Sequence, residues 1–453
     1  MKMTKALYEC LRNLVNKPSR IDGRIWVAAV LLGYFLLLFS ILRFSTGWDT
    51  AWKRLGVTGY VLPFLDARIV LAGFESKRLG YDAQLYNPSD PVGRRFANPD
   101  FWLALTPLGL TQSHAIFVGI ILALLFYISA FKIMGKLTLY EALVYSLILC
   151  SPSVMWIVER GNLDIVVYFL LTMSLVPITK SEKLVIRFFG YGIILITAFL
   201  KLFPIFALVV LLRERKKTLV FLAAVLVVPF AVYWFSNLEE LEKISRNLNL
   251  SETWNSFGYK VIFIIVANHF SSFNVATGLK AISKFSLALT VGVTCCSIGL
   301  RLIWKIFQQV KVWVNRDYDQ NKSLDSIAIG PYIDSFRLGC GLYAGAFLMG
   351  TVYDYKLSFL IFCIPQMLHW IKGKNRLNVI SSVALLGILG TLYLSSDQLS
   401  VLNFDEVINW FLVGFCSYSF AITLPEWVQL SIHKAAKRVK MRFPGYRTNM
   451  RNS

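Results

Sequence analysis

Residues 188–212, FFGYGIILITAFLKLFPIFALVVLL, decide how many times the chain is expected to cross the membrane. Two basic clusters flank this stretch: Lys180, Lys183 and Arg187 before it, and Arg213, Arg215, Lys216 and Lys217 after it. A single long membrane span would put the clusters on opposite sides. A hairpin of two short helices with its tip at LKLFP (200–204) keeps both on one side, and Pro204 breaks the helix where the hairpin turns. We therefore expect a short, re-entrant-like hairpin.

The rest of the chain is typical of a polytopic helical membrane protein. Its 453 residues are 56% hydrophobic and 16% charged, with a mean hydropathy of +0.58. Apolar runs of about 20 residues recur between charged residues, which is the length that crosses a bilayer. With the hairpin we predict an all-α fold of about twelve transmembrane helices; eleven would leave one basic terminus outside. The other expected spans are 25–43, 113–131, 138–157, 163–179, 218–236, 285–304, 338–352, 357–371, 377–395 and 407–429, and 101–110 is a candidate re-entrant segment.

Basic residues gather at the termini and in short loops, so the net charge of +21 indicates topology and anionic membrane lipid rather than a nucleic-acid partner. We expect residues 1–24 and the tail 433–453 to be cytoplasmic and 25–432 to form the membrane domain. Within it, 44–100 is the first extracytoplasmic loop, with interfacial helices, and 237–284 is a second large extracytoplasmic segment. The N-terminus shows no cleavable signal peptide.

Cysteine and histidine usage predicts no cofactor. The seven cysteines are scattered without a C-x-x-C pattern, and the four histidines do not cluster. This pattern indicates neither a disulfide framework nor a zinc site. A divalent ion bound by carboxylate ligands remains an alternative.

One acid stands out in FLDARIVLAG (64–73), a helical pattern that Pro63 should start and Gly73 should stop. Asp66 shares a face with apolar residues, and Arg68 points elsewhere. Burial would raise the pKa of Asp66 and make it a better base for an attacking hydroxyl. The alternative is that Asp66 caps the helix or forms an ion pair, on a solvated helix at the membrane interface. Other acids of the same loop are rivals: Asp49, Asp82, Asp90 and Asp100.

The predicted topology brings further polar groups to the same extracytoplasmic boundary. Candidate substrate-binding residues are Arg68, Arg94, Arg95, Glu159, Arg160, Asn162, Asp164, Lys201, Tyr355 and Lys356. Polar groups beside apolar spans are costly unless they are satisfied together, and the cations suit a lipid phosphate. Each also has an ordinary interpretation, as a solvated turn, a snorkelling lysine or an interfacial anchor.

In their order along the chain these stretches resemble an integral-membrane glycosyltransferase of the GT-C type, closest to bacterial polyprenol-phosphate-mannose-dependent mannosyltransferases and their uncharacterised relatives. The matching stretches are D-x-R-x-x-x-x-G (Asp66, Arg68, Gly73), GYDAQLYNPSDPVGRRFANPDFW (80–102), ERGNLD (159–164), LKLFP (200–204) and VYDYKLSFL (352–360). The resemblance covers most of the chain and is thin from about 218 to 350.

The resemblance implies sugar transfer from a polyprenyl-phosphate donor to a glycan, lipid or glycolipid hydroxyl, with inversion, on the outer face of the bacterial cytoplasmic membrane. Asp66 matches the family's base, and Arg160, Lys201 and Lys356 are candidate phosphate contacts. The chain departs from the family where Ala67, Arg68 and Ile69 replace an aromatic-rich stretch and where late histidine pairs are absent. These departures leave the donor sugar and the acceptor open.

Two other classes of function fit parts of the pattern. Broken helices such as the hairpin are also a feature of transporters and lipid flippases, although the two halves of the chain show no repeat. A surface-glycan polymerase or ligase would use the same lipid-phosphate chemistry on a larger donor. A membrane scaffold would leave the one-sided polar groups unexplained.

Overall fold

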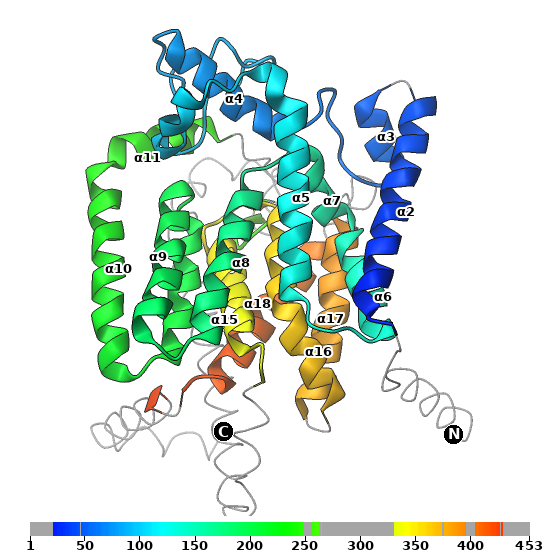
Figure 1. Cartoon of the computed structure of the whole chain (residues 1–453), viewed down its shortest axis with the longest axis vertical. Helices are drawn as coiled ribbons and strands as arrows, with labels where there is room; N and C mark the ends of the chain where they lie inside the picture. The colour runs from blue at the N-terminus through cyan, green and yellow to red at the C-terminus, as the bar shows by residue number, and fades with distance from the viewer. Residues whose placement is uncertain are drawn as a thin grey trace, which may run out of the picture.

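The computed structural model describes residues 21–45, 47–248, 255–261, 264, 330–373, 376–395, 404–425 and 427–428. It is mostly helical (Figure 1). The expected span 285–304, the tail 433–453, most of the N-terminal segment 1–24 and the later part of 237–284 lie outside these ranges. The longer helices run side by side: α2 (Gly23–Phe44), α5 (Ala115–Ile133), α8 (Asp164–Lys180), α10 (Lys216–Ser236), α15 (Ile333–Leu348), α17 (Arg376–Leu394) and α18 (Phe404–Ile422).

Among the described residues, four helices are long and apolar enough to cross a membrane: Gly23–Phe44, Gln112–Ile133, Lys216–Ser236 and Leu377–Leu394. A bent pair of helices would make a fifth span. The protein is therefore a candidate membrane protein by the length and composition of its helices. Twelve crossings stay a prediction.

The expected span 138–157 is two helices rather than one. α6 (Leu139–Leu149) and α7 (Pro152–Arg160) meet at a bend of 54°. Thr138 and Glu141 form a capping box that begins α6. Pro152 occupies the first turn of α7, where its missing N–H costs nothing, but it cannot continue the hydrogen bonding of α6. The bend carries the end of α7 to the polar groups described below.

The hairpin consists of α9 (Leu184–Leu200) and the 3₁₀ helix η3 (Phe203–Arg213). Its base is closed by Glu214, which accepts hydrogen bonds from Arg187 Nε (2.6 Å) and from the Tyr191 hydroxyl (2.7 Å). These contacts join the beginning of α9 to the end of η3. The chain therefore reverses at 201–202, next to Pro204, and the two ends of the hairpin lie together.

The late segments differ from the expected spans 338–352 and 357–371. α15 ends at Leu348 and is followed by a short strand, β2 (Val352–Tyr353), which pairs antiparallel with β1 (Ser256–Phe257). The 3₁₀ helix η5 (Asp354–Cys363) and α16 (Ile364–Lys372) then take the place of one span. The fold is therefore not purely helical: a two-stranded ribbon holds the YDYK region in place.

A polar cap lies at one end of the bundle, at the top of Figure 1. It contains α3 (Trp48–Arg54), α4 (Leu65–Arg78), the 3₁₀ helices η1 (Asp100–Leu108) and η2 (Gln112–His114), and α11 (Leu238–Asn247). Segment 101–110 is not a separate re-entrant loop but lies against α4, where Lys77 Nζ and Arg78 Nη2 donate to the carbonyls of Leu103 (3.4 Å) and Leu110 (2.9 Å). The first turn of α2 and the last turns of α18 lie at the opposite end (Figure 1).

The prediction that α4 ends at Gly73 is wrong. The helix passes Gly73 and ends at Arg78. A Cβ on Gly73 would lie 2.9 Å from the Phe96 ring, so this glycine permits close packing rather than stopping the helix.

Candidate functional site

The start of α4 is set by Phe64, which has a left-handed backbone (φ 56°). Its N–H donates to the carbonyl of Glu159 (3.2 Å). Its ring occupies the space that a side chain on Gly119 of α5 would need, and Gly161, also left-handed (φ 54°), lies against it. Left-handed backbone is costly for a bulky residue and persists where the surroundings enforce it. This packing fixes where Asp66, two residues later, is held.

Adding one methyl group at Gly119 is therefore expected to disturb the site. A Cβ there would lie 2.1 Å from the Phe64 ring. We expect Gly119→Ala to destabilise the protein by about 1–3 kcal/mol, as overpacking does. The matched control is Gly192→Ala in α9, where a Cβ would meet no atom within 4 Å. Thermal unfolding of the purified protein measures both, and equal midpoints would contradict this role for Gly119.

Asp66 is the centre of a compact ionic group. Arg160 donates from Nε to Oδ2 (2.6 Å) and from Nη2 to Oδ1 (2.5 Å), which is a bidentate pair. Asn162 Nδ2 donates to Oδ2 (2.5 Å), and Arg94 Nη1 lies 3.7 Å from Oδ1. The side chain of Asp66 is only 14% exposed. Bidentate guanidinium–carboxylate pairs are strong and hold both groups in one geometry.

The expectation of a raised pKa at Asp66 is wrong for this state of the protein. Burial raises the pKa of Asp66, but Arg160, together with Arg94 and Asn162, lowers it by more, so the pKa lies below the ordinary value of 3.8. Asp66 is therefore ionised at neutral pH. To act as a base, it must first lose part of its interaction with Arg160.

Aromatic rings surround the Arg160 guanidinium. Its Cζ lies 4.8 Å from the ring centroid of Tyr60, 5.5 Å from Trp156, 5.8 Å from Tyr353 and 5.9 Å from Tyr355. Cation–π contacts of this kind stabilise a guanidinium that is partly removed from water. The side chain of Arg160 is 11% exposed, so it is held in place by its neighbours but still reaches a surface.

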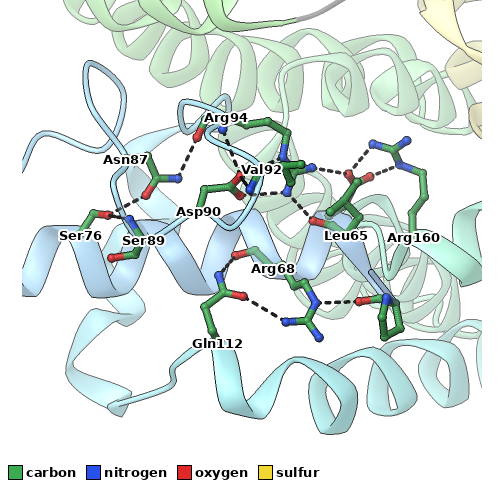
Figure 2. Close-up of polar contacts among 12 residues, drawn as sticks. Leu65, Arg68, Ser76, Asn87, Ser89, Asp90, Val92, Arg94, Gln112 and Arg160 are labelled. Atoms are coloured by element: carbon green, nitrogen blue, oxygen red, sulfur yellow. Dashed lines mark hydrogen bonds and ion pairs between the residues drawn. The ribbon is translucent and has the colours of Figure 1, made fainter. Parts of the chain in front are cut away.

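Arg94 joins the 80–95 loop to the start of α4, as Figure 2 shows. Its Nη2 donates to Asp90 Oδ2 (2.9 Å) and to the carbonyl of Leu65 (2.7 Å). The loop itself is tied to α4 by Ser76, whose hydroxyl donates to Asn87 Oδ1 (2.7 Å), while Asn87 Nδ2 donates to the carbonyl of Arg94 (3.1 Å). Asp90, a rival for the base, is therefore engaged in holding Arg94.

Two of the expected substrate-binding residues have other contacts. Arg68 lies on the other side of α4 (Figure 2), where Nε donates to the carbonyl of Pro63 (2.9 Å) and Nη1 to Gln112 Oε1 (3.4 Å). Glu159 is buried, and its Oε1 accepts from Trp48 Nε1 (2.9 Å) and from the Tyr60 N–H (3.3 Å). Both tie the cap together and do not line the pocket described next.

A pocket of about 450 Å³ opens beside Asp66. Its polar lining comes from six separate parts of the chain: Asp66; Arg94, Arg95 and Asn98; Arg160 and Asn162; Lys201; Arg246 and Asn247; and Tyr353 and Tyr355. Among the described residues, five cations thus face one space with a single lining carboxylate. Such a surface favours an anionic ligand.

Lys201 of the hairpin lines this pocket, whereas Lys356 of η5 does not. Lys201 Nζ is 3.1 Å from Asp164 Oδ1, whose side chain is fully buried. Lys356 Nζ lies 4.5 Å from the centre of the Phe203 ring and forms no ion pair with any residue that the structure describes. Asp164 therefore pairs with Lys201 without lining the pocket, and it also attracts the more distant Lys356.

Four polar residues that line the pocket were not among the expected binding residues: Asn98, Arg246, Asn247 and Tyr353. Sequence reasoning also missed Phe64, which positions Asp66 without lining the pocket. Tyr353 stands two residues before Tyr355, at the spacing that puts side chains on one face of a strand, and the rings stack at 5.6 Å. Arg246 on α11 lies in the 237–284 segment, and its side chain is 72% exposed. The signal available for Arg246 was only its place in a charged outer segment. No pattern in the sequence indicated the role of Phe64, because its left-handed backbone depends on its packing against Gly119 and Gly161.

The other rival acids do not line the pocket: Asp49 lies 3.5 Å from Lys53 Nζ, Asp82 lies 3.7 Å from Lys243 Nζ, and Asp100 accepts from Gln84 Nε2 (2.9 Å). Within the described ranges, no three His, Cys, Asp or Glu side chains are arranged to hold a metal ion. Comparisons of the chain with protein-family models, with curated proteins and with solved structures find no match.

Proposed function

We propose that this protein is a membrane glycosyltransferase that moves a sugar from a polyprenyl-phosphate donor to a hydroxyl acceptor on the extracytoplasmic face of a bacterial cytoplasmic membrane. One observation carries the proposal. A pocket at one end of a bundle with membrane-length helices is lined, in the part of the chain that the structure describes, by one carboxylate, Asp66, and five cations. A lipid phosphate needs cations, and an acceptor hydroxyl needs a base. The resemblance of the motifs to GT-C enzymes is consistent with this chemistry.

In this proposal the donor phosphate binds between Arg160, Lys201 and Lys356, with Arg94 beside them. Lys356 forms no ion pair with a described residue, although Asp164 attracts it, so a phosphate would supply the close anionic partner that it lacks. The rings of Tyr353 and Tyr355 offer an apolar wall against which a sugar ring can stack. Asn162 keeps Asp66 oriented whether or not Arg160 moves.

The reaction is a single displacement. The acceptor oxygen attacks the anomeric carbon, the bond from that carbon to the phosphate oxygen breaks, and its electron pair stays on the polyprenyl phosphate. The hydroxyl proton passes to Asp66. The incoming phosphate competes with Asp66 for the Arg160 guanidinium, which weakens the resting ion pair and raises the basicity of Asp66. Binding of the donor thus prepares the base, and the configuration of the sugar inverts.

A second candidate is a surface-glycan ligase or polymerase that uses a diphosphate-linked donor. Arg95 and Arg246 favour it, because they add two cations at the exposed side of the pocket. A donor with a second phosphate would use both. Affinity for matched monophosphate and diphosphate lipids distinguishes the candidates: Arg95→Ala with Arg246→Ala should weaken only the diphosphate if the second candidate holds.

The Lys356 contact can be tested alone. We expect Lys356→Ala to weaken donor binding by about 1–3 kcal/mol, the range for losing a charge-assisted contact. Lys243→Ala is the matched control, because Lys243 lies on α11 and is already paired with Asp82 and Glu239. Donor titration of both variants measures the difference. Equal affinities would remove Lys356 from the binding site.

The proposed function is tested directly by native mass spectrometry of the purified protein. We expect a co-bound polyprenyl-phosphate sugar, which should be lost when an acceptor is supplied. A flippase would be favoured if the protein binds the lipid but transfers no sugar to any of a panel of acceptors. In that case we expect it to move the lipid between the leaflets instead.

A further inference from the structure

A second pocket, of about 460 Å³, lies between α2 and α5 at the end of the bundle opposite the polar cap. Its walls are Leu124, Tyr127, Ile128 and Phe131 of α5, and its charged residues are Arg24 and Lys132. The pocket is thus apolar along its length and cationic at the ends of α2 and α5 that lie lower in Figure 1. Nothing in the proposed transfer reaction uses it.

Two contacts hold the two helices at a set distance, one at the base of the pocket and one at its Tyr127 wall. At the base, the Gly23 N–H donates to the carbonyl of Leu137 (2.9 Å), which follows α5. Further along, Phe35 of α2 packs edge-on against Tyr127 of α5, with ring centroids 5.8 Å apart. Eleven residues separate Arg24 from Phe35, about 16 Å along a helix. The pocket is therefore a slot between two helices whose spacing is fixed at its base and at its Tyr127 wall.

The charge at the base is not fully compensated. Arg24 is paired with Asp22, to which its Nε donates at 2.9 Å and its Nη2 at 2.6 Å. Lys132 is exposed and forms no ion pair within the described part of the chain. One carboxylate thus faces two cations, which leaves a net positive charge beside an apolar slot.

We propose that this slot binds one anionic phospholipid, with an acyl chain against α5 and the phosphate between Lys132 and Arg24. Charge complementarity favours an anionic headgroup, and apolar walls favour an acyl chain. A helix about 10 Å across would fill 460 Å³ within roughly one turn, so the slot is too small to seat a protein helix. The bound lipid belongs to the leaflet away from the polar cap.

Affinity for matched lipids tests the headgroup. Delipidated full-length protein is titrated with phosphatidylglycerol or phosphatidylcholine of the same chains, with native mass spectrometry as the readout. We expect phosphatidylglycerol to bind more tightly, and Lys132→Gln to lower its affinity about five-fold without changing that of phosphatidylcholine. Lys136→Gln is the control, since Lys136 is exposed on the next turn of chain and does not line the slot. Equal effects of the two variants would overturn the proposal.

A photo-crosslinking residue at Ile128 tests the occupant itself. We expect a phospholipid adduct in membranes, and its loss when Leu124→Trp fills the slot. An adduct to the chain's own residues 1–20 or to a second copy, or no lipid adduct at all, would show that the slot does not hold a lipid. Because none of these readouts involves sugar transfer, they stand apart from the proposed function.

Discussion

Asp66→Asn is expected to lower sugar transfer by about 10²–10⁴-fold, the contribution of a general base, while the protein still folds and binds its donor. The amide keeps the shape of the side chain and can still accept from Arg160, but it cannot take the proton of the acceptor. Initial rates with saturating donor and acceptor measure the effect. Donor titration of the same preparation shows that binding survives.

The matched control for this experiment is Asp82→Asn. Asp82 belongs to the same loop, but its carboxylate lies beside Lys243 and outside the pocket. We expect this variant to keep full activity. If Asp66→Asn were as active as Asp82→Asn, Asp66 would not be the base, and the proposed mechanism would fail at its central step.

Arg160→Ala is expected to have two effects, one on folding and one on binding. Removing the guanidinium leaves the Asp66 carboxylate buried without its main partner, which costs about 3–5 kcal/mol of stability in comparable pairs. It also removes a proposed phosphate contact, so donor binding should weaken by about 1–3 kcal/mol. Thermal unfolding measures the first effect and donor titration the second.

The double variant Asp66→Asn with Arg160→Ala separates these effects. We expect it to recover much of the stability lost in Arg160→Ala, because no unpaired buried charge remains. Donor binding should stay weak, because the phosphate contact is still absent. Recovery of donor affinity together with stability would mean that Arg160 acts only on folding and does not contact the donor.

Much of the candidate site could be predicted from short motifs. Arg160 and Asn162 are two residues apart at the end of one helix, and both contact Asp66, which lies more than ninety residues earlier. Polar residues gathered at the ends of apolar runs are costly in isolation, so sequence reasoning could expect them to meet. The same reasoning could not assign individual contacts, and it grouped Arg68 and Glu159 with residues that line the pocket.

The pKa of Asp66 shows why local sequence patterns are insufficient to predict the protonation of a site residue. Apolar neighbours along α4 favour a raised pKa, and residues 64–73 contain no cation on the helical face of Asp66. The guanidiniums that lower the pKa come from α7 and from the 80–95 loop. Their effect depends on distances of a few ångströms, which no single segment encodes.

The sequence by itself determined a helical protein with membrane-length apolar segments, the reversal of the chain near Pro204, and the aspartate that deserved a test. These follow from hydropathy, charge clusters and proline, which act within one segment. Only the tertiary structure decided that α6 and α7 meet at a bend, that Phe64 adopts a left-handed backbone, and that Arg160 pairs with Asp66. Each of these depends on which surfaces pack together, because close approach and the strength of ion pairs are set by neighbours that are distant in sequence.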